Sequence, residues 1–226
     1  MSPPEVSSSA GRETIIDGSA YLGVAEGLPA VTTNALKRLL DVVIAFALLL
    51  LVLPVLLLLC LIIRLESRGP SLFGQKRRGL NGKPFTILKL RTMRLSKPDG
   101  VKQATRDDDR ITWTGKILRR TSIDELPQLL NVLWGHMSLV GPRPHAVEHD
   151  DAHSAVIPNY HLRFRARPGL TGLAQISGLR GEVKTPECIA RRIEADNIYI
   201  DRWSHWQDFK IIMMTIPHLL LTRQAY

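Results

Sequence analysis

The strongest constraint on the fold of this chain is an apolar run, Val42–Ile63, of 22 residues without a charge or a side-chain amide. As a single helix the run would be about 33 Å long, enough to cross a bilayer. Pro54 lies inside it, where proline removes a backbone donor and bends a helix. Bases flank both ends, which disfavours a crossing because one basic flank would then lie on each side of the membrane. The run predicts either a spanning helix or a re-entrant helix-break-helix.

The rest of the chain divides around this run. Residues 1–35 are rich in proline, serine and glycine without a persistent period, which predicts a disordered tail. Residues 36–68 hold the membrane segment and residues 69–226 a polar domain. The net charge is +9, of which residues 1–36 contribute −3 and the remainder +12. A domain this basic predicts an anionic partner, which would be nucleic acid, an anionic lipid bilayer or a phosphorylated substrate.

Patterns in the polar domain predict a small mixed α+β fold. Asn81-Gly82 is a strong two-residue turn signal, so strands are expected at 71–78 and 84–92. Helices are expected at 115–121, 123–134 and 186–202. The closing apolar stretch at 209–222 is too short to span and reads as a core or interfacial helix. Two cysteines without zinc spacing suit a reducing cytoplasm.

The best candidate for chemistry is the acidic pair Asp124-Glu125. Ser122 and Glu125 have the spacing of a capping box, and Pro127 is tolerated near a helix start, so the pair is expected in a first helical turn. The helix dipole there favours ionised carboxylates. One carboxylate could attack phosphorus, and its neighbour could hold Mg²⁺ or orient the partner. A bare Asp-Glu pair at a helix start is also an ordinary capping feature.

Arginines and further acids supply other candidates. Arg143 stands between two prolines, which would aim its guanidinium at a phosphate with little entropy to lose. The alternating Arg163, Arg165 and Arg167 would share one face of a strand, as phosphate ligands or as a basic edge. Asp107 and Asp109 have a spacing that can hold a metal against a nucleotide diphosphate, although acidic triplets are usually solvated. The histidines at 145, 149 and 153 read as a surface helix rather than a metal site.

Several ordered strings resemble one known family, the bacterial sugar transferases, which are monotopic phosphoglycosyl transferases. They cover about residues 36–222 and include Lys37-Arg38-x-x-Asp41, Lys89-x-Arg91-Thr92-Met93, Ser122-x-Asp124-Glu125-Leu126-Pro127-Gln128-Leu129-x-Asn131, Gly141-Pro142-Arg143-Pro144 and Arg167-Pro168-Gly169-Leu170-Thr171-Gly172-x-x-Gln175. The short chain is most similar to members that initiate exopolysaccharide assembly. One position departs from the pattern, because Leu53 stands where many members carry serine before the kinking proline.

This resemblance implies a function and a set of site residues. The enzyme would move a hexose-1-phosphate from a UDP-sugar to undecaprenyl phosphate through a phosphosugar on Asp124, with release of UMP. Glu125 would complete the catalytic pair, and both would hold Mg²⁺. The implied substrate contacts are Lys89, Arg91, Arg120, Arg143, Arg167 and Gln175. A re-entrant helix kinked at Pro54 would fix the catalytic domain, with amphipathic interfacial helices, on the cytoplasmic face of the inner membrane.

Two other functions remain as alternatives. A metal-dependent glycosyltransferase using Asp107 and Asp109 would release UDP and form no covalent enzyme species. A membrane-tethered protein that binds nucleic acid or anionic lipid would show no turnover. The basic strands lack interleaved aromatic residues, so nucleic acid is not expected as a partner. The sequence leaves the sugar open, with a neutral hexose favoured by the resemblance, and it leaves open whether the protein forms a homodimer.

Overall fold

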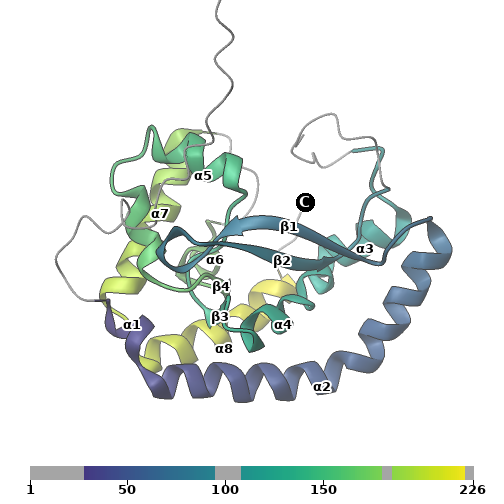
Figure 1. Cartoon of the computed structure of the whole chain (residues 1–226), viewed down its shortest axis with the longest axis horizontal. Coiled ribbons are helices and arrows are strands. Elements are labelled where there is room, and N and C mark those ends of the chain that lie inside the picture. Colours follow the sequence, from purple (N-terminus) through teal and green to yellow (C-terminus); the bar gives the residue numbers. More distant parts are fainter. Residues whose placement is uncertain (1–27, 95–107, 180–184, 222–226) are drawn as a thin grey trace, which may run out of the picture.

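One long helix, α2 (Ala35–Glu66), follows the whole length of the molecule, and the other elements are built on one side of it (Figure 1). The computed structural model describes residues 28–94, 108–179 and 185–221. These residues form a mixed fold of helices and two small sheets, which confirms the predicted helix-and-sheet class.

Helix α2 bends around the domain but does not break. Pro54 lies inside the helix, and Ala35–Glu66 remains continuously helical. The predicted helix-break-helix is therefore wrong in this respect: the loss of one backbone donor bends a helix without ending it when the rest of its length is held. Figure 1 shows the helix curving along the domain, with its inner side against β3 and α4.

The beginning of α2 is anchored by buried charges. Asp41, 5% exposed, accepts hydrogen bonds from Ser138 Oγ at 2.7 Å and from the Leu139 amide at 3.1 Å. Lys37 lies 3.8 Å from Asp41 and 2.8 Å from Asp208. Buried charges that are paired and hydrogen-bonded hold their surroundings in one arrangement. This junction fixes the start of α2 to β3 (Ser138–Val140) and α8 (His205–Leu221).

The end of α2 is anchored by a buried arginine. Arg91, 4% exposed, donates to the carbonyl oxygens of Ile63 at 3.2 Å, Ser67 at 2.6 Å and Arg68 at 2.8 Å. These carbonyls lie at the helix end, where backbone acceptors have no partner within the helix. Glu66 in turn accepts from the Thr114 amide at 3.1 Å, at the start of α3 (Trp113–Thr121). Both ends of the apolar helix are thus fixed to one domain.

The described residues just before α2 contain a short helix. Residues 1–27 of the predicted tail lie outside the described residues. Ala30–Thr33 form the short helix α1 rather than a disordered segment. Val31 is buried in the main core, and Thr32 Oγ1 donates to the Arg165 carbonyl at 2.7 Å. Packing against the domain overrides the weak local signal in these residues.

The two sheets are small. The predicted hairpin is confirmed: β1 (Leu72–Arg78) and β2 (Pro84–Leu90) are antiparallel, and the connection contains the one-turn helix η2 (Leu80–Gly82). Asn81 and Gly82 take positive φ values of 56° and 70°, as the turn signal predicts. In the second sheet, β3 runs parallel to β4 (Gly169–Thr171).

Helices complete the domain, and two local predictions fail. The helical elements are η3 (Ile123–Glu125), α4 (Gln128–Leu133), α5 (Val147–Ser154), η4 (Tyr160–Arg165), α6 (Leu173–Ile176) and α7 (Pro186–Asp201). Arg163 and Arg165 lie in the helix η4, so the predicted strand with three arginines on one face is wrong. Ser122 makes no side-chain cap, and Glu125 bonds elsewhere, so the predicted capping box is wrong as well.

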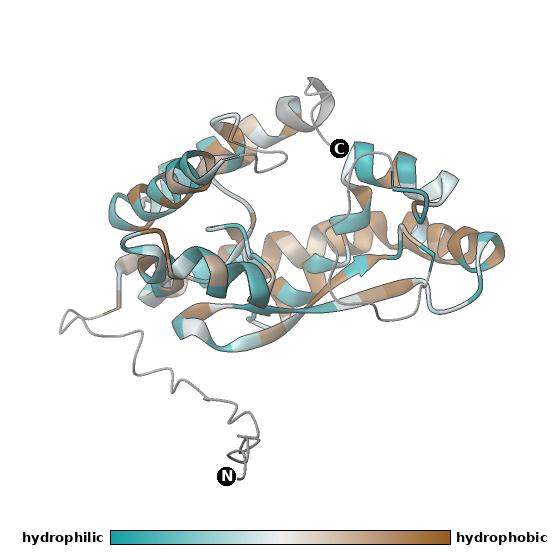
Figure 2. Cartoon of the chain, turned by 90° about the horizontal axis from the view of Figure 1, so that it is seen from above, coloured by the Kyte–Doolittle hydropathy of each residue, from teal (hydrophilic) through white to brown (hydrophobic). Residues whose placement is uncertain are grey.

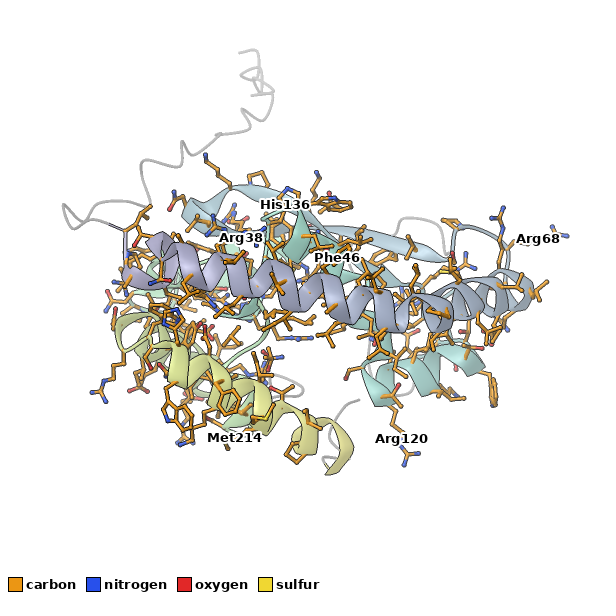
Figure 3. All side chains as sticks on the ribbon, turned by 90° about the horizontal axis from the view of Figure 1, so that it is seen from below. Arg38, Phe46, Arg68, Arg120, His136 and Met214 are labelled. Carbon is orange, nitrogen blue, oxygen red and sulfur yellow. The ribbon has the colours of Figure 1, made fainter. Side chains whose placement is uncertain are left out.

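An exposed apolar surface runs along the lower face of the molecule. Helix α2 is long and apolar enough to cross a membrane, and 11% of its most apolar window is buried. Figure 2 shows hydrophobic colour along α2, and Figure 3 shows α8 and α3 on the same side of α2, opposite the hairpin of β1 and β2. The exposed side chains include Phe46 and Leu51 of α2, Trp206 and Met214 of α8, and Trp113 of α3. A patch of this extent marks an interaction with a membrane or another protein.

Replacing the arginine that anchors the end of α2 should destabilise the fold. We expect Arg91→Met to lower the free energy of unfolding by about 2 kcal/mol or more, because several carbonyls lose a charged donor. Chemical unfolding of the purified protein in detergent measures this change. Arg68→Met is the control, since this side chain is exposed and directed away from the domain (Figure 3); its effect should stay within about 0.5 kcal/mol. Equal stability of the two variants would contradict the anchoring role.

Candidate active site

The acidic pair Asp124-Glu125 lies in a tight turn between two helices. Ser122 ends α3 in a left-handed conformation, with φ 58°, and the chain continues into the one-turn helix η3. Pro127 then precedes α4, where its missing amide hydrogen leaves no helical bond unmade. Asp124 is buried, 8% exposed. It lies in the separate one-turn helix η3, whereas the sequence predicted the first turn of a single helix at 123–134.

Three separate segments meet at the carboxylate of Glu125. Lys89 from β2 donates to its Oε1 at 2.9 Å. Arg143, which follows β3, donates to Oε1 at 2.5 Å and to Oε2 at 3.1 Å. Burial opposes the ionisation of Glu125, but Arg143 and then Lys89 outweigh it and hold the pKa of this carboxyl well below its usual value. Glu125 is therefore ionised in the folded protein.

Asp124 has the opposite electrostatic environment. Burial, and secondarily the charge of Glu125, raise its pKa to about 6, against the opposing effect of Lys89, Arg119 and Arg143. Asp124 makes no side-chain hydrogen bond or ion pair with another described residue. Two adjacent carboxyls with pKa values pushed apart are typical of a site that uses them in different roles. The ionised Asp124 would be a poorly solvated and therefore reactive carboxylate.

Close packing of backbones holds the turn that carries Arg143. The Gly169 amide donates to the Pro142 carbonyl at 2.8 Å, and the Gly141 amide donates to the Thr171 carbonyl at 2.9 Å. A Cβ atom on Gly141 or Gly169 would overlap the facing backbone. Glycine is required at both positions for this close approach. The Gly141–Pro144 string and the Gly169–Gly172 string thus form one structural unit that aims Arg143 at Glu125.

The structure brings together only some of the predicted substrate contacts. Lys89 and Arg143 meet at the acidic pair. Arg91 is bound to the end of α2, which leaves its predicted contact with phosphate without support. Figure 3 shows Arg120 exposed on α3 and directed away from the domain. Arg167 donates to the Gly135 carbonyl at 3.1 Å and to the Thr32 carbonyl of α1 at 3.4 Å. Gln175 Nε2 donates to the Leu170 carbonyl at 3.4 Å.

Two arginines near the site were not among the predicted contacts. Arg119, in the last turn of α3, acts electrostatically on Asp124. Arg77, on β1, is partly buried beside Arg143; burial and then the charge of Arg143 lower its pKa to about 10. A hairpin with many bases does not indicate which of their side chains turn inward. In the structure, the burial of Arg77 and its interaction with Arg143 identify it as an inward residue.

The other acidic and histidine candidates do not gather into a metal site. Asp107 lies outside the described residues, Asp108 pairs with Arg110 at 2.6 Å, and Asp109 is exposed. Among the described residues, no group of three or more histidine, cysteine or acidic side chains could hold a metal ion. His153 instead makes edge-to-face contacts with His145 and His149, with ring centroids 6.0 and 6.1 Å apart.

An acidic pair in which cations bind one member, beside a long apolar helix, suits a membrane-associated transferase of phosphate groups. The bacterial sugar transferase family matches residues 32–222. A UDP-glucose:undecaprenyl-phosphate glucose-1-phosphate transferase of Caulobacter vibrioides is 60% identical over 201 residues, covering 88% of this chain and 75% of the relative. The Escherichia coli protein of the same name is 48% identical, but the alignment covers only 41% of its length. The exopolysaccharide production protein PSS of Rhizobium leguminosarum is 46% identical over 80% of this chain and 93% of its own.

The chain therefore belongs to the bacterial sugar transferase family and is an enzyme of the phosphoglycosyl transferase class. The match begins near α1 and ends in the segment that follows α8, so it includes both the apolar helix and the whole described domain. Several relatives, including the E. coli protein, are more than twice as long as the matched region.

Neutralising Glu125 should change the ionisation of its neighbour. In metal-free protein we expect the side-chain carboxyl of Asp124 to titrate with a midpoint at about 6. Glu125→Gln removes a negative charge and leaves Lys89 and Arg143 in place, so the pKa of Asp124 should fall. NMR titration of carboxyl carbons measures it, with Asp124→Asn identifying the signal. An unchanged midpoint in the glutamine variant would contradict this account of the pair.

Proposed function

We propose that this enzyme transfers a hexose-1-phosphate from a UDP-sugar to undecaprenyl phosphate through a covalent intermediate on Asp124. The observation that carries the proposal is the acidic pair itself: a buried Asp124 without a partner among the described residues, beside a Glu125 held by Lys89 and Arg143. This arrangement leaves one carboxylate available for attack and fixes the other. The relatives named as UDP-glucose:undecaprenyl-phosphate transferases favour UDP-glucose as the donor.

The proposed chemistry has two displacements at one phosphorus. A carboxylate oxygen of Asp124 attacks the β-phosphorus of the UDP-sugar, and the bond from that phosphorus to the bridging oxygen breaks, which releases UMP. An oxygen of undecaprenyl phosphate then attacks the phosphosugar, forms a diphosphate and frees the carboxylate. Lys89 and Arg143 are placed to offset the charge that gathers when carboxylates and a diphosphate come together.

The residues present suit a magnesium ion. Asp124 offers carboxylate oxygens that no described cation pairs with directly, and burial and the charge of Glu125 raise its pKa despite the nearby cations. Carboxylates together with substrate phosphates are the usual ligands of Mg²⁺. Asp124 and Glu125 would hold the ion, and the ion would supply charge neutralisation at the diphosphate. The protein's own contribution remains the alignment of Asp124 and the fixed cations around Glu125.

The fold also supports a membrane position for the acceptor. Ile123 and Leu126, on either side of the acidic pair, pack against the apolar cluster that contains Leu56 and Ile63 of α2. A polyprenyl phosphate carries its phosphate at the head-group plane, and this arrangement would set Asp124 near that plane. The basic domain would then contact anionic lipid. We place it on the cytoplasmic face of the inner membrane, at the first membrane step of exopolysaccharide assembly.

Anchoring of α2 at both ends favours a helix that enters and leaves on one side. Lys37 and Asp41 fix its beginning, and Arg91 fixes its end, to the same polar domain. A helix that crossed the bilayer would place these two anchors on opposite sides of the hydrocarbon layer, about 30 Å apart. The bent helix would instead lie with its exposed apolar side in one leaflet.

Loss of the proposed nucleophile should abolish the covalent step. We expect Asp124→Asn to eliminate both turnover and the mass increase on the protein when UDP-glucose is supplied with Mg²⁺, because an amide does not displace UMP. Intact-protein mass spectrometry and nucleotide chromatography measure the two effects. Asp109→Asn, at an exposed position, is the matched control and should keep both. Primary release of UDP would instead favour the metal-dependent glycosyltransferase.

Cysteine labelling can test the position of both ends of α2. Cys60 and Cys188 are replaced by serine, and single cysteines are introduced as Ser8→Cys in the tail and Ser177→Cys on the exposed end of α6. We expect neither variant to react with an impermeant reagent added outside intact spheroplasts, and both to react after permeabilisation. Reaction of the tail alone from outside would show that α2 spans the membrane and would overturn the proposed topology.

A further inference from the structure

A second charged cluster is buried in the domain and is centred on Arg163. Arg163 is 3% exposed and lies in η4. It is 3.0 Å from Asp196 of α7 and 3.6 Å from Asp150 of α5, and it donates to the Tyr160 hydroxyl at 3.0 Å. Tyr160 in turn donates to Asp150 at 2.6 Å. The cluster thus joins three helices through one guanidinium.

The same guanidinium also holds the turn that carries Arg143. Its Nη2 donates to the backbone carbonyl of Arg143 through a short hydrogen bond, and its Nη1 lies 2.7 Å from His145 Nδ1. Arginine can only donate, so His145 must accept at Nδ1 and is neutral. Burial, followed by the charge of Arg163, keeps the pKa of His145 well below its usual value, in agreement with this tautomer. Arg163 therefore bonds to the residues on both sides of Pro144, which are Arg143 and His145.

We propose that Arg163 is a positioning residue for the transfer reaction, which fixes the Pro142–Pro144 turn so that Arg143 reaches Glu125. A buried guanidinium has a rigid fork of donors. Here Nη2 contacts the Arg143 carbonyl and Asp196, and Nη1 contacts His145, directly after the turn, and Tyr160. The Arg143 carbonyl and its side chain are joined by a few rotatable bonds, so a shift of the turn moves the guanidinium at Glu125. This inference rests on the role of Arg143 in the proposed function.

A double-mutant cycle tests the connection. The variants are Arg143→Ala, Arg163→Lys and the pair together, assayed for kcat and KM with UDP-glucose and undecaprenyl phosphate in Mg²⁺. Lysine keeps the charge of Arg163 but cannot reach all of its acceptors. We expect Arg163→Lys to lower kcat/KM on the order of tenfold, and the double variant to be no worse than Arg143→Ala, since coupled residues are non-additive. Arg165→Lys is the matched control and should be near wild type, because its ion pair with Asp201 is exposed.

The outcomes separate the inference from the function on which it rests. Independent losses that multiply in the double variant, or a wild-type rate for Arg163→Lys, would overturn the positioning role. If Arg143→Ala itself has wild-type kinetics, the proposed role of Arg143 fails, whereas the covalent step on Asp124 is tested separately by mass. Thermal unfolding is recorded for every variant. If Arg163→Lys does not fold, Asp196→Asn replaces it, because this change weakens the hold on Arg163 with little change of shape and should show the same non-additivity.

Discussion

The anchoring of one apolar helix at both ends to a single polar domain is the constraint on which the other features of this protein depend. At the beginning of α2, Lys37 and Asp41 join it to β3 and α8; at its end, Arg91 satisfies the free carbonyls. Because it is fixed twice, the elements that follow it, including the acidic turn, keep a defined position relative to the apolar surface.

Ionic contacts within the domain divide into two kinds, which explains how a chain with many bases can build both a scaffold and a site. Arg91 and Arg163 are fully buried, and each donates to several acceptors, including backbone carbonyls, so their charges serve the fold. Lys89 and Arg143 are partly exposed and share one carboxylate. Their two positive charges meet at one acid beside Asp124, where they would offset the negative charge of a diphosphate.

Sequence reasoning found the larger elements and the acidic pair but not the local arrangement around it. The hairpin followed from Asn81-Gly82, because this turn signal is local, and the helix expected at 186–202 corresponds to α7. The separate turn η3 and the role of Arg91 depend on contacts between residues far apart in the chain, which periodicity does not record. The prediction of a strand at Arg163–Arg167 failed for a related reason: alternating arginines fit a strand, but burial of Tyr160 and Phe164 favours a tight helix in this place.

The opposite ionisation of the two adjacent acids follows from the same long-range contacts. Glu125 forms ion pairs with Lys89 of β2 and with Arg143 of the turn after β3, and these contacts fix its side chain. Asp124, one residue earlier, forms no hydrogen bond with either cation, and burial together with the charge of Glu125 raises its pKa more than the cations lower it. The difference between a fixed carboxylate and an available one is therefore set by the turn geometry after Ser122. The Asp-Glu pair has a common sequence. The hairpin and the Pro-Arg-Pro turn supply the cations that give its two acids the different environments of the proposed nucleophile and its partner.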